Sequence, residues 1–200
     1  MNIKVWAKNE LIATTPSNIP LWHWSDDKTI AKLKLIILAH GSFRHFRQGA
    51  VGSGLYASNS AVDLMERGPQ VIHFNIKPGT KALMIHPLVF STGMPEIFEM
   101  ALESLNWSDF HLPVPNAKLD IVSQPALVID NLLDELELPC CFYTFGLHLA
   151  CMVRDSRCLN FDPELDSIKT VLTYHQANPQ DIPMLAPQLL SNWLARHQSL

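Results

Sequence analysis

The sequence predicts a single domain of mixed α+β class. Segments with apolar residues at helical spacing occur together with short runs in which apolar and polar residues alternate as in a strand. The chain has 200 residues, of which 48% are hydrophobic and 17% charged. This is long enough for one filled core and too apolar for a disordered protein. Because no repeat or low-complexity run divides the chain, residues 1–200 are expected to form one domain.

Most of the strands are expected in the first half of the chain. "PLWHWSDD" indicates a short strand that enters a helix, because Ser25 is a good N-cap and the aspartates after it favour the positive end of the helix dipole. This helix is expected from Asp26 to about Ala39, with Gly41 as its stop. A short helix is predicted over 59–67. "VIHFNIK" alternates like a strand, and "PGT" makes the turn into a second strand, "KALMI".

Further helices are predicted from Pro95 onward. Pro95 and Pro125 each stand at a first helical position, where proline is favoured. "CCFYTF" and "RCLNF" indicate strands, while "GLHLACMVRD" between them fits either a helix or a strand. Two helices are expected to close the chain, near 167–176 and 187–197.

Charge and cysteine content exclude some classes of partner. The net charge of −4 gives no electrostatic reason to expect nucleic acid, although Arg44, His45 and Arg47 form a local cluster that a phosphate could meet. The cysteines lack the CxxC spacing of zinc sites, so no metal is expected and buried reduced thiols, typical of the cytosol, are predicted. These four are Cys140, Cys141, Cys151 and Cys158.

The N-terminal residues "MNIKVWAKNELIATTP" lack an apolar core of signal-peptide length. No apolar run approaches the roughly 18 residues that a membrane-spanning helix needs. We therefore expect a soluble protein that is cytoplasmic where it is made and does not contact a membrane.

The stretch "GSGLYASNS" is the strongest candidate for a binding element. Gly52 and Gly54 allow the backbone to turn and to approach another group closely, so the chain itself places Tyr56. A simpler interpretation is a loop end, a short strand and a serine cap for the next helix.

Three features in order, "HWS" at 23–25, "GSGLYAS" at 52–58 and a strand followed by "PGTKAL", resemble the ADP-ribosyltransferase superfamily. The resemblance is to the branch with a His-Tyr-Glu triad, which includes diphtheria toxin and the poly(ADP-ribose) polymerases. Tyr56 follows His23 by 33 positions, close to what that family shows, and the similarity covers residues 20–85. It implies a split β-sheet core flanked by helices, with NAD as the substrate. ADP-ribose would pass to an unidentified protein acceptor as nicotinamide leaves.

The resemblance also implies roles for individual residues. His23 would hold a ribose hydroxyl through a hydrogen donated by Nε2, and Tyr56 would offer a flat face on which nicotinamide stacks. The backbone of Trp24 would pair with the nicotinamide carboxamide. Further contacts to NAD are expected from Ser25, Gly54 and Ser58.

An acidic residue is expected to stabilise the positive charge that develops on the ribose. The resemblance places a glutamate at the start of a late strand. Asp155, just ahead of "RCLNF", fits this position best but is one methylene shorter. Glu137, ahead of "CCFYTF", and Glu164, after "RCLNF", are alternatives, and the acid could also be absent.

The chain departs from the family pattern at two further positions. Trp24 stands where the family usually has glycine, which crowds the entrance for nicotinamide. Arg67 stands where a second aromatic residue often follows the tyrosine. A competing "HGS" at 40–42 lies only 16 residues before Tyr56, too few for a strand, a helix and a loop.

Other functions remain open from the sequence. A module that binds NAD or another protein without catalysis would keep the fold but lack the acid. A hydrolase or acyltransferase could instead use His148 with one of the cysteines, most simply Cys151. A variant with water as acceptor would be an NAD glycohydrolase. By analogy at the level of the fold, the small size fits a bacterial effector or toxin that is translocated into a target cell.

Overall fold

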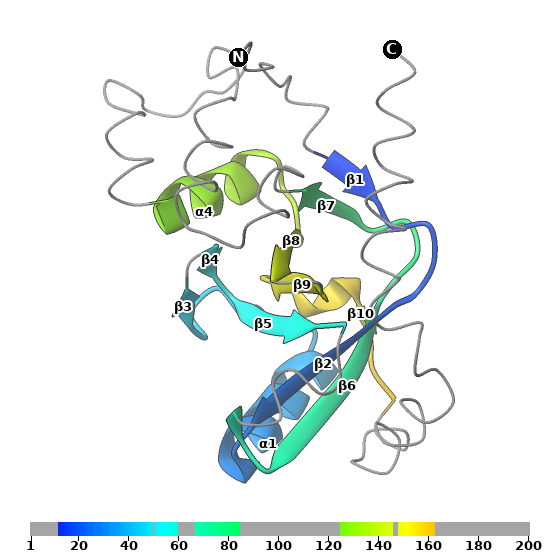
Figure 1. Cartoon of the computed structure of the whole chain (residues 1–200), viewed down its shortest axis with the longest axis vertical. Coiled ribbons are helices and arrows are strands. Elements are labelled where there is room, and N and C mark those ends of the chain that lie inside the picture. The colour runs from blue at the N-terminus through cyan, green and yellow to red at the C-terminus, as the bar shows by residue number, and fades with distance from the viewer. Residues whose placement is uncertain (1–11, 50, 60–66, 85–124, 146–147, 163–200) are drawn as a thin grey trace.

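The computed structural model describes residues 12–49, 51–59, 67–84, 125–145 and 148–162. These residues form a mixed α+β structure, mostly strands, with two α-helices and one curled sheet (Figure 1). The strands of this sheet are β1 (Ile12–Thr14), β2 (Ile19–Ser25), β5 (Leu55–Ser58), β6 (Gln70–Ile76), β7 (Lys81–Met84), β8 (Cys140–Phe145), β9 (His148–Val153) and β10 (Leu159–Asn160). The predicted α+β class is therefore confirmed. The helices expected near Pro95, 167–176 and 187–197, and nearly all of 59–67, lie outside the described residues.

The order of the eight strands is β1-β7-β8-β9-β5-β2-β6-β10. Neighbours are antiparallel except β7 and β8, which are parallel. β2 pairs with β6 over its whole length, but with β5 only at Trp22 and Ser58. In Figure 1, β2 and β6 run together away from β5, β8 and β9. The sheet therefore bends where β2 leaves β5, next to His23.

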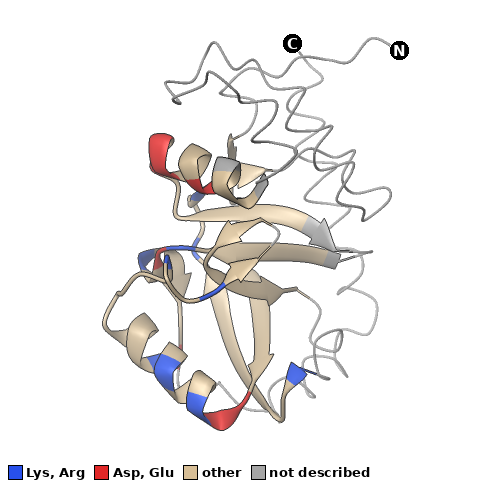
Figure 2. Cartoon of the chain, turned by 90° about the vertical axis from the view of Figure 1, so that its left-hand side faces the viewer, with Lys and Arg blue, Asp and Glu red and all other residues tan. Residues whose placement is uncertain are grey.

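Helix α1 (Asp27–Leu38) follows β2 directly. Its N-cap is Asp26, whose carboxylate accepts hydrogen bonds of 2.8 Å from both the backbone N–H and the hydroxyl of Thr29. Ser25, the predicted cap, is instead the last residue of β2. Acidic side chains stand at the start of the helix and basic ones further along it (Figure 2), as the helix dipole favours at the first turn.

Helix α1 ends within a residue of the predicted Ala39, but Gly41 is not its stop. Its C-cap is Ala39, and the left-handed residue after the helix is His40 (φ 51°), so Gly41 does not itself end the helix. The Gly41 amide still donates to the Ile36 carbonyl at 2.8 Å, which ties the chain back onto the last turn.

Helix α4 (Pro125–Glu135) begins at the proline that predicted it. It contacts the short two-stranded sheet formed by β3 (Gln48–Gly49) and β4 (Gly52–Ser53) and buries Ile129, Leu132 and Leu133. The ambiguous segment "GLHLACMVRD" supplies strand β9. The strand predicted over "RCLNF" is mostly wrong, because a 3₁₀ turn (Ser156–Cys158) takes its place and leaves only β10 extended.

The core lies on the sheet between these helices and contains the four cysteines. All four are buried and unpaired by disulfides. The prediction of buried reduced thiols is confirmed.

Substitution of Gly54 by alanine is expected to destabilise the fold strongly. A Cβ there would overlap the sulfur of Met152 and lie 2.6 Å from the Val153 carbonyl oxygen on β9. We expect a loss of more than about 2 kcal/mol in the free energy of unfolding, measured by chemical denaturation. Gly79→Ala is the matched control: its φ of 77° is unfavourable but its Cβ would meet nothing within 4 Å. This control should cost only about 1 kcal/mol, and equal losses in the two variants would contradict the close approach of β5 and β9.

Candidate functional site

His23 and Tyr56 are joined where β2 and β5 separate. The Nδ1 of His23 lies 2.6 Å from the carbonyl oxygen of Tyr56. A carbonyl only accepts hydrogen bonds, so Nδ1 must carry the proton, and a neutral imidazole then presents Nε2 as an acceptor. Nε2 is buried and has no hydrogen-bond partner among the described residues. The structure therefore corrects the expected role of this atom: in the neutral ring, Nε2 accepts a hydrogen bond and does not donate one.

Burial keeps His23 in this neutral form. The residue is 8% exposed, and its desolvation lowers the pKa below the ordinary 6.5. The hydrogen bond to Tyr56 raises the pKa, whereas the charges of Arg47 and Arg67 lower it. The resulting lowered pKa leaves the ring uncharged at neutral pH.

Tyr56 is held at its hydroxyl end by the turn that precedes it. Its hydroxyl donates to the Gly52 carbonyl at 2.5 Å and accepts from the Val51 amide at 3.3 Å. A Cβ on Gly49 would lie 2.5 Å from both Cζ and the hydroxyl oxygen of Tyr56, so glycine is required there. Burial raises the pKa of Tyr56, so its hydroxyl stays protonated. With the hydroxyl already engaged, the face of the ring is the part that remains for a ligand.

The two glycines of the predicted hinge, Gly52 and Gly54, are needed for different reasons. Gly52 has a φ of 106°, a conformation that side chains with a Cβ rarely adopt. Gly54 has no such backbone requirement, and its need for glycine is the contact with β9 described above. Gly54 does not line the cavity at this site, so the expected contact to NAD is not placed by the structure.

A cavity of about 490 Å³ opens beside these groups. Of the residues expected to bind NAD, the cavity lining includes His23, Trp24, Ser25, Tyr56 and Ser58. The lining also contains residues that sequence reasoning did not place there, namely Thr29, Phe46, Arg47, Gly49, Val51, Ala57, Tyr143 and Ala150. Arg67, which stands where the family often has a second aromatic residue, lines the cavity as well.

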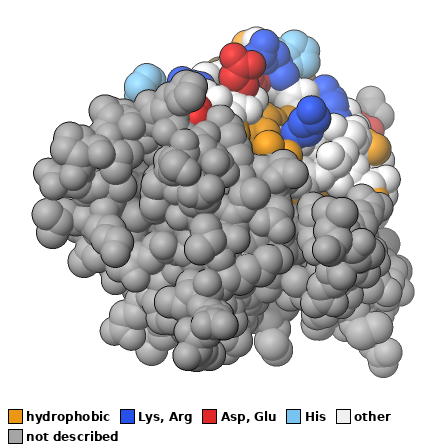
Figure 3. All heavy atoms as spheres, turned by 90° about the horizontal axis from the view of Figure 1, so that it is seen from above, with side chains coloured by type: hydrophobic (Ala, Val, Ile, Leu, Met, Phe, Trp, Pro, Cys, Tyr) orange, Lys and Arg blue, Asp and Glu red, His pale blue; other side chains and the backbone are white. Residues whose placement is uncertain are grey.

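The cavity combines aromatic walls with positive charge. Tyr143 meets Tyr56 edge to face, with ring centroids 6.3 Å apart. Arg47 and Arg67 are exposed and line the same space. The basic cluster of Arg44, His45 and Arg47, which a phosphate could meet, is the sequence signal that could have identified Arg47. The described part of the face in Figure 3 mixes basic and acidic side chains.

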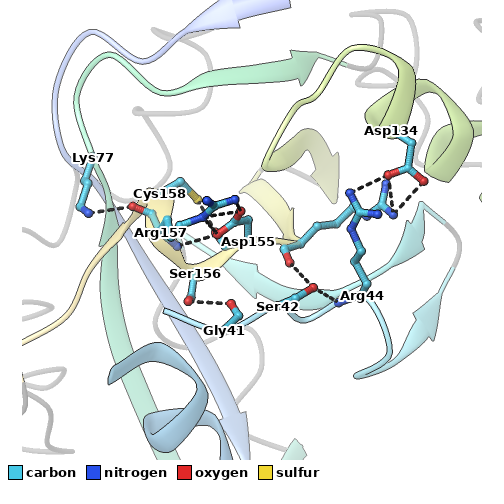
Figure 4. A network of polar contacts seen from close by, with 10 residues as sticks. Gly41, Ser42, Arg44, Lys77, Asp134, Asp155, Ser156, Arg157 and Cys158 are labelled. Carbon is cyan, nitrogen blue, oxygen red and sulfur yellow. Dashed lines mark hydrogen bonds and ion pairs between the residues drawn. The ribbon is translucent and has the colours of Figure 1, made fainter. Parts of the chain in front are cut away.

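Asp155 does not join His23 and Tyr56. Its carboxylate caps the 3₁₀ turn, accepting the Arg157 amide at 2.9 Å, and forms an ion pair with the Arg157 guanidinium (Figure 4). These hydrogen bonds to Arg157 lower the pKa of Asp155. Asp155 is not among the residues that line the cavity. The prediction that Asp155 supplies the acid of this site is therefore corrected: the structure assigns Asp155 a capping role.

The cavity lining contains no Asp or Glu among the described residues. Glu137 follows α4 in a left-handed conformation (φ 52°) and is not part of the lining, and Glu164 lies outside the described residues. One of the two strands beside β5 is β9, and it contributes Ala150 to the cavity. The sequence left this strand undecided because the segment fitted a helix equally well.

The alternative of His148 with one of the cysteines falls on a strand, because both His148 and Cys151 belong to β9. Burial raises the pKa of the Cys151 thiol and, even more, that of Cys141. Protonated, buried thiols are poor nucleophiles.

Comparisons of the chain with protein-family models, curated proteins and solved structures gave no match. Within the described ranges, no helix has the length and apolar character needed to cross a membrane. These ranges also contain no group of three or more His, Cys, Asp or Glu side chains able to hold a metal ion.

The lowered pKa of His23 makes stability depend on pH. Between the folded pKa and the unfolded value of 6.5, the unfolded chain binds more protons, so stability falls as the pH drops through this window. Between about pH 7.5 and about pH 5.5, the wild type should lose unfolding free energy in part because the pKa of His23 is lowered. We expect His23→Asn to abolish this part, which is up to about 1.4 kcal/mol for each unit by which the pKa is lowered. Denaturation curves at both pH values measure this. Exposed His45→Asn is the control, and an identical pH dependence in all three proteins would contradict a buried neutral His23.

Proposed function

We propose that this protein is an NAD-dependent ADP-ribosyltransferase of the His-Tyr-Glu branch, with a split-sheet core. The observation that carries the proposal is the pairing of His23 with Tyr56 in one cavity. The resemblance required these two residues to meet, and a hydrogen bond of 2.6 Å joins them across the separation of β2 and β5. The single point of pairing between these strands supports the split sheet.

The residues present fit NAD. The buried Nε2 of His23 accepts a hydrogen bond, and a ribose hydroxyl is a donor of the right kind. The ring of Tyr56 offers its face to nicotinamide while its hydroxyl is engaged elsewhere. Arg47 and Arg67 provide positive charge for the pyrophosphate. The cavity volume of about 490 Å³ is within the usual range for small-molecule sites.

In the proposed reaction, NAD supplies the bond between nicotinamide and ribose C1′. When this bond breaks, its electron pair leaves with nicotinamide, and an acceptor nucleophile on a protein side chain, or water in a glycohydrolase, bonds to C1′ and gives up its proton. His23 and Tyr56 orient the two halves of the breaking bond, so much of the rate effect comes from positioning. No described cavity residue is assigned the stabilisation of the positive ribose.

A second function is favoured by the cavity lining. Because the described lining has no carboxylate, a protein that binds NAD without cleaving it would use the same histidine, tyrosine and arginines. Such a protein would bind NAD in a titration and release no nicotinamide.

The decisive experiment follows nicotinamide release, and label transfer to lysate proteins, from NAD labelled on its adenine side. We expect His23→Ala and Tyr56→Ala to lower turnover by about 100-fold because each loses orientation of the substrate. Tyr56→Phe should stay within about tenfold, since the ring face is retained. His45→Ala, an exposed histidine outside the cavity, is the control. Unchanged turnover in correctly folded His23→Ala would refute the proposal.

The arginines allow a second test with a close control. Arg47→Gln should raise KM for NAD by about fivefold to tenfold with little change in kcat, because a charge facing the pyrophosphate is lost. Arg44 is exposed like Arg47 but pairs with Asp134 and does not line the cavity, so Arg44→Gln should leave KM unchanged. Steady-state kinetics at fixed ionic strength measure KM for both variants. Equal increases in KM would mean that the arginines act by long-range attraction of NAD and not by contact in the cavity.

A further inference from the structure

The turn that holds Tyr56 is itself held by helix α4. One carboxylate oxygen of Asp130 accepts the backbone N–H of Ser53 at 2.8 Å. The same oxygen lies so close to Gly52 that a Cβ there would be 2.5 Å away. The Gly52 carbonyl in turn accepts the Tyr56 hydroxyl. A continuous chain of contacts therefore runs from the helix to the tyrosine ring.

A buried arginine holds Asp130 and its helix in place. Arg154, 5% exposed, follows β9 and donates to the backbone carbonyl of Asp130 at 2.8 Å. Its Nε lies 4.0 Å from the Asp130 carboxylate, and its terminal nitrogen pairs with Asp134 at 3.1 Å. Asp134 also binds Arg44 from the loop after α1 (Figure 4). Only Asp130, which has 15% of its side chain exposed against 45% for Asp134, reaches the turn.

We propose that Asp130 is a positioning residue for Tyr56, acting through the amide of Ser53. A carboxylate that accepts a backbone N–H makes a strong, charge-assisted hydrogen bond. This bond holds the turn next to Gly52, whose φ is positive and whose carbonyl accepts the hydrogen bond from the Tyr56 hydroxyl. Its consequence for catalysis rests on the proposed function, whereas its structural part does not.

The test compares Asp130→Ala, Asp130→Asn and Asp134→Asn. Asn at 130 keeps an oxygen that can accept the Ser53 amide but loses the charge that faces Arg154. Alanine loses both. Asp134→Asn weakens the interaction with Arg154 from the same helix without touching the turn. Thermal denaturation of each variant reports the ion pairs, while amide hydrogen exchange at Ser53, followed by NMR in the full chain, reports the turn.

We expect the Ser53 amide to exchange roughly tenfold faster or more in Asp130→Ala, less so in Asp130→Asn, which keeps a neutral acceptor, and close to the wild-type rate in Asp134→Asn. Both Asp130 variants should lose Tm because each loses the charge that faces Arg154, and the loss should be larger in Asp130→Ala, which also loses the acceptor of the Ser53 amide. Wild-type exchange in Asp130→Ala, or equal acceleration in Asp134→Asn, would overturn the proposal. If Asp130→Ala does not fold, faster exchange at Ser53 in Asp130→Asn than in Asp134→Asn would support the proposal, and equal exchange in these two variants would overturn it.

The same variants separate this inference from the proposed function. With NAD as the probe, kcat/KM should fall by about tenfold in Asp130→Ala and by less than about threefold in Asp130→Asn. If the wild type does not cleave NAD, the proposed function fails while the exchange at Ser53 still decides the positioning role. Normal turnover with accelerated exchange in Asp130→Ala would mean that the turn is held by Asp130 but does not control catalysis.

Discussion

The hydrogen bond between His23 Nδ1 and the Tyr56 carbonyl is the interaction on which the site depends. Strand pairing between β2 and β5 is confined to Trp22 and Ser58, so this bond links the strands where their ladder does not. It also determines the tautomer of the imidazole, because the carbonyl can only accept. One contact therefore accounts for both the relative position of the two residues and the acceptor character of Nε2. A buried acceptor without a partner in the described structure is costly unless a ligand supplies the donor.

Close approach of the backbone is the second constraint, and it explains the concentration of glycine before Tyr56. Gly49 leaves room for the tyrosine ring, Gly52 adopts a positive φ against the carboxylate of Asp130, and Gly54 lies against β9. These requirements are of three kinds: space for a side chain, a backbone conformation, and contact between strands. Together they fix the ring from several directions, which leaves its face as the free recognition surface.

The acidic side chains of the described structure serve stability more than chemistry. Asp26 caps α1, Asp155 caps the 3₁₀ turn, and Asp134 joins Arg44 to Arg154. A carboxylate that caps a turn or forms an ion pair is already engaged and is less available to a ligand. The cavity, in contrast, is lined by basic, aromatic and small polar residues. Such a lining suits an anionic ligand with a flat ring, and the proposed substrate NAD has both features.

The sequence by itself predicted the α+β class, the helices that follow Ser25 and begin at Pro125, and the burial of the cysteines, and a family resemblance added the candidate pair His23 and Tyr56. These follow from local signals: apolar periodicity, proline and capping residues, and a short motif with glycine. Only the tertiary structure decided which nitrogen of His23 is free, that Asp155 is a cap, that "GLHLACMVRD" is a strand and that Arg67 and Tyr143 share a cavity with Trp24. Most of these depend on groups far apart in the chain, such as His23 and Tyr56, which are separated by 33 residues, whereas the Asp155 cap is a contact with Arg157 two residues on. Local patterns carry no record of such partners, because hydrogen bonds and burial arise only when the strands and helices pack together.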